Sequence, residues 1–316
     1  MATNPLVSAV IPTHNRAALL PRAVRSVLGQ TYPHFECIIV DDSSADSTPE
    51  VARQFGDGRV VYVRHAVNRG GSASRNTGIG LARGALLAFL DDDDEWFPAK
   101  LEKQVSLMQA SPRDVGVVHC TSYVASEDGS WRLVRDAASF TGDVYVRLLQ
   151  GCCPSITSMV MVRRECFEVC GRFDEALPSY QDYDMWLRLA QSQYRFGCVC
   201  EPLVVVYDHE GSRLSVDSAP RRVGMERILR KWGPEIRKNL GEKGYQQLQR
   251  CFIAGIEFNA TRRSIQRGEL RLAARHLLEV ICQQPAKPRA YGRLLLQLVR
   301  AASVAAVSQV MNARRK

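Results

Sequence analysis

The chain has 316 residues, of which 46% are apolar and 24% are charged. These are ordinary values for a globular protein, and the length provides ample material for one large domain with an appendage or for two small domains. Since no window reaches about 18 uncharged apolar residues, we expect no membrane-spanning helix.

The net charge of +9 is unevenly distributed along the chain. Residues 220–316 contain 21 lysines and arginines against 6 acids, a net charge of +15, and the preceding part carries −6. The basic part has three alternative explanations: a solvated helical surface, a patch that faces anionic lipid, or a nucleic-acid site. Nucleic acid is the weakest of these, because no zinc-finger, RNP-type or basic-zipper motif accompanies the charge.

The ten cysteines do not predict a disulfide scaffold, because the chain is too long and core-rich to need one. Cys37, Cys120 and Cys166 lie among apolar neighbours and are predicted to be core residues. Cys152–Cys153 and Cys198–Cys200 lack the paired spacing of a zinc site, so no cysteine is assigned to metal. The absence of a signal-like segment at the N-terminus favours a reducing cytoplasm.

The first 120 residues alternate between strand and helix patterns. Short apolar runs predict strands, and between them the spacing of apolar residues predicts helices, two of which begin with expected capping residues, Asn15 and the capping box Ser47–Glu50. The expected strands are 7–12, 35–40, 60–63, 85–90 and 115–120. One helix is expected between Asn15 and Tyr32-Pro33, one is expected to start at the capping box 47–50, and two more are expected at 72–83 and 98–109. This alternation indicates an α/β fold with a mainly parallel sheet covered by helices on both faces.

The second half is less regular. It contains a turn at 127–130, apolar strand-like runs at 157–162 and 204–207, and a helical pattern at 180–190. Beyond Ala219 only helices are expected, including the strongly amphipathic segment 269–283. We therefore predict two domains: residues 1–217, which hold the α/β fold, and residues 218–316, a basic α-helical C-terminal extension.

Polar clusters follow each of the first four predicted strands. They are Thr13–Arg16, Asp41–Ser44, Asn68–Gly71 and the acid run Asp91–Glu95. In parallel α/β sheets, ligands bind beyond the carboxyl ends of the strands, so these clusters predict one binding site.

The common phosphate-binding loops are missing. No P-loop motif occurs, and the dinucleotide-type start Gly78-Ile79-Gly80 has Arg83 in the place of its third glycine and precedes its strand. These departures argue against a P-loop ATPase and an NAD enzyme. Carboxylates at a strand edge are instead suited to bind Mg²⁺ or Mn²⁺, a cation that a diphosphate would also bind. Arg16, Arg69 and Arg75 are candidates to bind the oxygens of that diphosphate.

Five motifs occur in a fixed order along the chain: Val10–Arg16, Ile39–Ser44, Arg75–Gly78, Phe89–Asp94, and Gly171–Glu175 with Gln181–Arg188. Together they resemble the inverting family 2 glycosyltransferases of the bacterial polysaccharide type, which have the GT-A fold. The resemblance covers residues 5 to 215.

The resemblance implies roles for individual residues around a nucleotide-sugar. Pro12, Thr13, Asn15 and Arg16 would line the nucleotide pocket, and Arg75 would contact the donor. Asp41 and Asp42 would meet the base, with Asp42 preferred. Asp91 and Asp93 match the family's D-x-D positions for ribose and metal; Asp93 is the first choice as metal ligand, and Asp92 is an alternative to Asp91. His209 is either a metal or diphosphate contact or a surface histidine.

The resemblance also implies a catalytic base, Asp182. Gln181 stands where the family usually has glutamate, which leaves Asp182 in place. The residues alone favour a helix cap for Asp182, and the resemblance favours the base. A carboxylate that takes the proton of a sugar hydroxyl accelerates transfer by about 10²- to 10⁴-fold.

These features predict an inverting, metal-dependent glycosyltransferase. It would move a sugar from a nucleotide-sugar, with UDP expected, to a glycan or lipid-linked acceptor. The basic helices would hold it at the inner, cytoplasmic face of a membrane or only pack onto the catalytic domain. The alternatives are a non-catalytic nucleotide-sugar-binding scaffold, and a sugar-1-phosphate nucleotidyltransferase, whose usual glycine-rich basic loop is replaced here by Pro12–Asn15.

Overall fold

The computed structural model describes residues 4–126, 130–134, 140–153, 156–208, 218–284 and 288–313. The chain divides into two compact units. The first comprises residues 1–148, 152–176 and 181–210, and the second comprises 149–151, 177–180 and 211–316. The predicted boundary at residue 217 falls outside the described residues.

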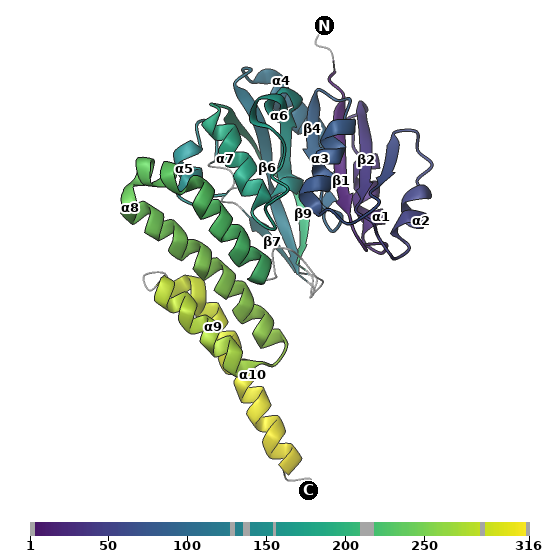
Figure 1. Cartoon of the computed structure of the whole chain (residues 1–316). Helices are drawn as coiled ribbons and strands as arrows, with labels where there is room; N and C mark the ends of the chain where they lie inside the picture. The colour runs from purple at the N-terminus through teal and green to yellow at the C-terminus, as the bar shows by residue number, and fades with distance from the viewer. Residues whose placement is uncertain are drawn as a thin grey trace. The chain divides into compact units, whose positions relative to one another are not determined.

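A single mixed sheet forms the centre of the first unit (Figure 1). Four parallel strands lie side by side in the order β3-β2-β1-β4, and they are β1 (Val7–Thr13), β2 (Phe35–Asp41), β3 (Val60–Arg64) and β4 (Leu86–Phe89). The sheet then continues through β8 (Val160–Arg163), β6 (Val115–Ser126), β9 (Arg195–Asp208) and β5 (Glu95–Trp96), with β7 (Trp131–Val134) paired to β6. β8 is antiparallel to both neighbours, whereas β6 and β9 are parallel to each other. The predicted mainly parallel α/β sheet is confirmed, with an antiparallel insertion.

Short helices connect the strands of this sheet. They are α1 (Leu20–Leu28), α2 (Thr48–Arg53), α3 (Gly71–Leu81), α4 (Lys100–Ala110), α5 (Tyr145–Leu149), α6 (Arg164–Cys170) and α7 (Gln181–Gln191), with the 3₁₀ turn η2 (Thr157–Met159). The predicted helical periodicity after Asn15 is confirmed, because Leu20, Ala23, Val24 and Val27 are the buried residues of α1. The segment 157–162 was expected to be a strand, but its first half is η2 and only its second half enters β8.

Of the two predicted caps, the one at Asn15 is wrong, because the N-cap of α1 is Leu19. Ser47 is the N-cap of α2, as predicted, but it makes no side-chain capping bond. Asn15 instead adopts a left-handed conformation with φ of 54°, where its side chain bonds a neighbouring loop. Its amide is thus used for tertiary contacts between loops rather than for helix initiation.

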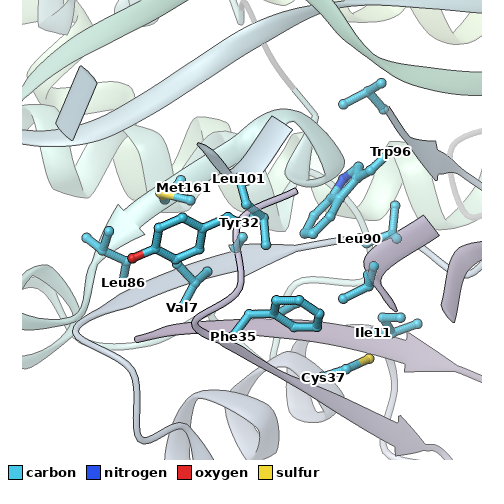
Figure 2. Close-up of a cluster of buried hydrophobic side chains, with 14 of the residues drawn as sticks. Val7, Ile11, Tyr32, Phe35, Cys37, Leu86, Leu90, Trp96, Leu101 and Met161 are labelled. Carbon is cyan, nitrogen blue, oxygen red and sulfur yellow. The ribbon is translucent and has the colours of Figure 1, made fainter. Parts of the chain in front are cut away.

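The main core lies between the sheet and the helices on one of its faces. All of β2 is buried, as expected for a central parallel strand with no solvent-facing side. Figure 2 shows part of this cluster, in which Val7, Phe35 and Leu86 lie close to Tyr32 and Met161. The predicted core positions of Cys37, Cys120 and Cys166 are confirmed.

Close contact between α3 and β1 depends on a glycine. A Cβ atom at Gly78 would lie 2.3 Å from a methyl carbon of Val10. Because real carbon atoms cannot approach so closely, only glycine lets α3 pack this tightly on the sheet.

The second unit is helical, as the sequence predicts beyond Ala219. It contains α8 (Ser218–Gln266), α9 (Leu270–Gln283) and α10 (Pro288–Ala313). α8 is interrupted at Gly241, whose φ is 69° and ψ is 179°, so it consists of two helical segments. Glu257 is 2% exposed within this unit and accepts bonds from Arg222 and His276, which links α8 to α9.

In the described parts of both units, no helix is long and apolar enough to cross a membrane.

Candidate active site

The carboxyl ends of the four parallel strands bring the predicted polar clusters to one edge of the sheet. β1 ends at Thr13, and β2 ends beside it at Asp41. β3 continues into the loop that opens α3, and β4 leads into the acid run. Pro12, the half-buried residue before Thr13, pairs with Val40 in this part of the sheet. The convergence that the sequence predicts is therefore present.

The loop after β1 is tied to the loop after β2. The Asn15 N–H donates to the Ser44 hydroxyl at 2.9 Å, and the Ala45 N–H donates to the Asn15 side-chain oxygen at 2.7 Å. The Arg16 N–H donates to the Thr48 hydroxyl. Backbone segments that lie 30 residues apart are thereby fixed against each other at the rim of the site.

Asp41 is completely buried at the end of β2. Its carboxylate accepts hydrogen bonds from the Ser44 N–H and the Tyr62 hydroxyl, both at 2.8 Å, and lies 3.6 Å from the guanidinium of Arg64. Burial, together with the hydrogen bond to Asp41, raises the pKa of Tyr62 to about 12. The contacts made by Asp41 hold β2 and β3 together.

Asp42 organises the loop between β3 and α3. It is 3% exposed and accepts hydrogen bonds from the backbone N–H groups of Arg69 and Gly70 at 2.8 and 2.6 Å. Its third partner is His65, whose Nδ1 lies 2.8 Å away. The other ring nitrogen of His65 lies 2.9 Å from the Thr77 hydroxyl, so the imidazole is held from both sides.

Asp91 begins the acid run and faces Arg75. The Arg75 guanidinium donates to its carboxylate at 2.5 Å, and the Thr157 hydroxyl lies 3.3 Å from both carboxylate oxygens. The Asp91 N–H donates to the hydroxyl of the fully buried Ser158. The side chain of Asp91 nevertheless keeps 31% of its surface exposed, so a ligand can reach it.

Asp92 points back toward β1. The Thr13 hydroxyl donates to its carboxylate at 2.7 Å. Burial of this 8% exposed residue, opposed by that hydrogen bond and reinforced by Asp93, raises its pKa to about 7. Asp92 is therefore less accessible to a ligand than Asp91.

Asp93 lies near the loop that follows β1. Its carboxylate lies 3.9 Å from the Arg16 guanidinium, and its backbone carbonyl accepts a 2.5 Å bond from Arg22. The next residue, Asp94, accepts a hydrogen bond of 2.6 Å from Ser158. Ser158 thus ties both ends of the turn from Asp91 to Asp94.

The described residues contain no group of three or more acidic, histidine or cysteine side chains that would enclose a metal ion by themselves. His209, the third predicted ligand, lies outside the described residues. Asp91 and Asp93 are a donor set of the kind that Mg²⁺ or Mn²⁺ uses when substrate phosphates and water supply the remaining ligands. The acid run therefore suits a cation whose ligands come from the protein, the substrate phosphates and water together.

Asp182 lies in the first turn of α7. The Tyr183 N–H donates to its carboxylate at 2.8 Å. Burial raises the pKa of Asp182, an effect that the Tyr183 N–H and the positive charge of Arg75 oppose and the charge of Asp91 reinforces. Asp182, Arg75 and Asp91 are therefore electrostatic neighbours, although more than 90 residues separate Asp91 from Asp182.

Two residues of α7 near Asp182 are fully buried. Asp184 accepts a hydrogen bond of 2.9 Å from the Arg188 guanidinium. Trp186 is part of the core. Arg69, a candidate phosphate contact, pairs with Glu175 at 3.2 Å on the surface.

Four contact residues escaped the sequence reasoning: Arg22, His65, Thr157 and Ser158. Thr157 and Ser158 reach the acid run from a segment more than 60 residues away, in a run that looks like an ordinary strand. No local pattern marks such residues. His65 could have been found, because it directly follows β3 and so belongs to the same sheet edge.

Comparison with known proteins identifies the family. The family model described as Glycosyl transferase family 2 matches residues 8–171. The chain belongs to glycosyl transferase family 2. It is 32% identical over 229 residues to the putative colanic acid biosynthesis glycosyl transferase WcaA of Escherichia coli. The aligned residues cover 70% of this chain and 79% of WcaA.

A second family 2 relative is the putative teichuronic acid biosynthesis glycosyltransferase TuaG of Bacillus subtilis. It is 42% identical over 106 residues, which cover 33% of this chain and 42% of TuaG. The chain therefore spans less than half of the length of that relative.

Solved structures establish the fold as that of GT-A glycosyltransferases. S. aureus TarS in complex with UDP-GlcNAc superposes with a TM-score of 0.58 at 16% identity and covers 88% of this chain and 92% of that one. The mannosyltransferase PcManGT from Pyrobaculum calidifontis, in complex with GDP-Man and Mn²⁺, superposes with a TM-score of 0.58 at 21% identity. The superposition covers 96% of this chain and 87% of PcManGT.

Proposed function

We propose that this family 2 chain is an inverting, metal-dependent glycosyltransferase with Asp182 as its general base. The observation that carries the proposal is the setting of Asp182. Burial raises its pKa, and it is an electrostatic neighbour of Arg75 and Asp91, which belong to the acid-run side of the site. A carboxylate with a raised pKa beside a donor site is suited to take a proton from a hydroxyl.

The reaction is a single displacement. An acceptor hydroxyl oxygen forms a bond to the anomeric carbon while the bond between that carbon and the diphosphate oxygen breaks from the opposite face. The hydroxyl proton passes to Asp182, and the electron pair leaves with the nucleoside diphosphate. One displacement inverts the anomeric configuration.

The donor would lie along the edge formed by β1, β2 and β4. Pro12, Thr13 and Asn15 would line the nucleotide pocket at the end of β1, and Asp41 and Asp42 are the expected base contacts. Arg16 and Arg75 both face carboxylates of the run at present, and a diphosphate would compete for these guanidinium groups. Structural neighbours bind UDP-GlcNAc and GDP-Man, and we expect UDP here.

Mg²⁺ or Mn²⁺ would be held by Asp93 and Asp91, together with diphosphate oxygens and, if it reaches the site, His209. When bound, such a cation offsets charge that builds up on the leaving diphosphate. The ion pairs with Arg16 and Arg75 orient the side chains of Asp93 and Asp91 at this edge of the sheet.

The acceptor is expected to be a glycan or a lipid-linked sugar of polysaccharide biosynthesis. Colanic acid and teichuronic acid biosynthesis, in the names of two relatives, support this class.

We further expect the enzyme to work at the cytoplasmic side of a membrane, with peripheral contact through the basic helices. In α10, Leu295, Leu296 and Val299 are exposed between Arg293 and Arg300. Apolar side chains flanked by arginines favour an anionic lipid surface. Co-sedimentation with anionic vesicles at low salt, but not with neutral ones, tests this contact.

Calorimetry with UDP, GDP and CDP, with and without Mn²⁺, tests the donor site. We expect one nucleotide to bind in a metal-dependent way. Asp182→Asn should leave that binding intact and lower transfer by about 10²- to 10⁴-fold. Binding without transfer by the wild-type chain would favour the scaffold alternative, to which Gln181 in the place of the usual glutamate gives some weight.

The pH profile gives an independent test of Asp182. Because the base acts only when deprotonated, transfer should fall as the pH drops through its pKa, and this acid limb should lie above the ordinary aspartate value of 3.8. A limb at or below that value would contradict the role.

A further inference from the structure

Three aromatic side chains form a contiguous surface cluster that the donor site does not use. Phe97, Tyr123 and Trp131 contact one another, with ring centroids 5.6 to 6.4 Å apart. Trp131 is 53% exposed, and Phe97 and Tyr123 are half-buried. Large exposed aromatic groups gathered at one place usually mark a binding surface.

The strand register places this cluster on one face of the sheet, together with polar groups. Tyr123 and Glu95 both lie opposite Val205 of β9, and Trp131 and Tyr207 both lie opposite Ala125 of β6. Side chains that lie directly opposite across strands share a face. The face therefore carries the three aromatic rings with Glu95 and Tyr207 beside them.

This face adjoins the acid run directly. Glu95 follows Asp94 in the chain and accepts a 2.7 Å hydrogen bond from the Tyr207 hydroxyl. The Arg22 guanidinium stacks 3.6 Å from the centroid of the Tyr207 ring and also donates to the Asp93 carbonyl. A continuous set of contacts therefore connects the expected cation-binding turn with the aromatic face.

We propose that Phe97, Tyr123 and Trp131 form the binding surface for a sugar ring of the acceptor. This inference rests on the proposed glycosyl transfer and assigns its second substrate a place. The C–H groups on one side of a pyranose ring carry partial positive charge and pack against the negative faces of aromatic rings. Glu95 and Tyr207 supply polar partners for the ring hydroxyls at the end nearest the acid run.

A sugar fits this face better than a lipid chain or an apolar peptide does. The aromatic area is small, and its border toward the acid run is a carboxylate, a phenol and a guanidinium. An apolar chain would have to desolvate these groups without pairing them, whereas sugar hydroxyls can pair with them.

Tryptophan fluorescence can report occupancy of this face. The chain has four tryptophans, and Trp96, Trp186 and Trp232 are at most 4% exposed, so acrylamide quenching should report mainly on Trp131. We would titrate the full chain, with UDP and Mn²⁺ present, with octyl glycosides of glucose, galactose, mannose and N-acetylglucosamine. At least one should protect Trp131 from quenching, and the protection should vanish in Trp131→Phe. If no glycoside changes the quenching measured with UDP and Mn²⁺ alone, the proposal is overturned.

The most protective glycoside is then used as acceptor, and the ratio of transferred to hydrolysed donor sugar is measured. Trp131→Ala should lower this ratio about tenfold, whereas Trp131→Phe should retain most of it because the aromatic face remains. Val169→Ala, which removes an apolar side chain of 65% exposure on α6, is the matched control and should keep the wild-type ratio. A wild-type ratio in Trp131→Ala, or protection without transfer, would overturn the acceptor role.

The two proposals fail in distinguishable ways. If the wild-type chain neither binds a nucleotide nor consumes a nucleotide-sugar, the proposed transferase itself fails. If the donor is bound and hydrolysed while the Trp131 variants behave as wild type, only the acceptor surface fails.

Discussion

Two acidic clusters lie at the same edge of the sheet, and their surroundings differ. Asp41 and Asp42 are 0% and 3% exposed, and five hydrogen bonds from side chains and backbone N–H groups converge on them. Asp91 and Asp93 face guanidinium groups, and the side chain of Asp91 is 31% exposed. The first cluster mainly builds the edge, whereas the second leaves one carboxylate, that of Asp91, accessible to a ligand.

The largest expected effect on stability is that of Asp42→Ala. It would leave His65 and the N–H groups of Arg69 and Gly70 without their acceptor, at a cost of about 4 kcal/mol in the free energy of unfolding. Urea unfolding measures this loss. Asp42→Asn, which keeps one acceptor oxygen, is the graded control and should cost less. A loss below about 1 kcal/mol for Asp42→Ala would contradict the structural role.

Asp93→Asn should instead lower activity strongly and stability little. The free energy of unfolding should change less than in Asp42→Ala, because Asn keeps the shape of the side chain and one acceptor oxygen, and the carboxylate lies as far as 3.9 Å from the Arg16 guanidinium. Transfer should fall by about 10²- to 10³-fold, the effect of losing several kcal/mol of charge stabilisation on the leaving group. A Mn²⁺ titration of activity measures the expected rise in the metal concentration needed. Unchanged metal dependence would remove Asp93 from the expected ligands.

The contrast between the two clusters also shows how far the sequence leads. Apolar runs separated by helical patterns predicted β1 to β4 and the meeting of their carboxyl ends, because those features are local. The two-residue strand β5 was missed, since Glu95 and Trp96 are extended only through pairing with Val204 and Val205 of β9. The sequence did not show how deeply each acid pair is enclosed, because this depends on distant partners such as His65 and Ser158.

The buried side chain of Lys100 predicts a pH dependence of stability. Lys100 is fully buried, donates to Gln104 at 2.7 Å and lies 3.9 Å from the centroid of the Trp96 ring, and burial lowers its pKa to about 8 from 10.5. Between these values the unfolded chain binds more protons than the folded one, so stability from this group rises with pH. Below pH 8 the buried charge of Lys100 lowers the free energy of unfolding by up to about 3 kcal/mol.

Lys100→Met should therefore be more stable than the wild type at pH 7, by about 2 kcal/mol after loss of the contacts with Gln104 and Trp96. The advantage should shrink from pH 8 to pH 10. Urea unfolding at several pH values measures it, with Lys103→Met on the exposed side of α4 as the matched control. An advantage that stays constant across this range would show that the charge of Lys100 is not the cause.

The smallest expected effect concerns Ser158, which connects the scaffold to the acid run. Its hydroxyl accepts from the Asp91 N–H and donates to Asp94, and its carbonyl accepts from the Trp96 indole. Ser158→Ala removes only the hydroxyl contacts and should cost about 1 kcal/mol in the free energy of unfolding. Because these contacts fix the turn that presents Asp91 and Asp93, transfer should fall about tenfold through weaker metal binding.

Saturating Mn²⁺ should restore most of the activity of Ser158→Ala, since both carboxylates remain. Thr157→Val is the matched control at the adjacent position, where the hydroxyl contacts the exposed Asp91 carboxylate at 3.3 Å and is not the anchor of the turn. If Ser158→Ala lost activity that no concentration of Mn²⁺ recovered, the turn would have a role beyond holding the cation ligands. Asp94, to which the Ser158 hydroxyl donates, would then have to be assigned either to the acids that build the sheet edge or to those that bind a ligand.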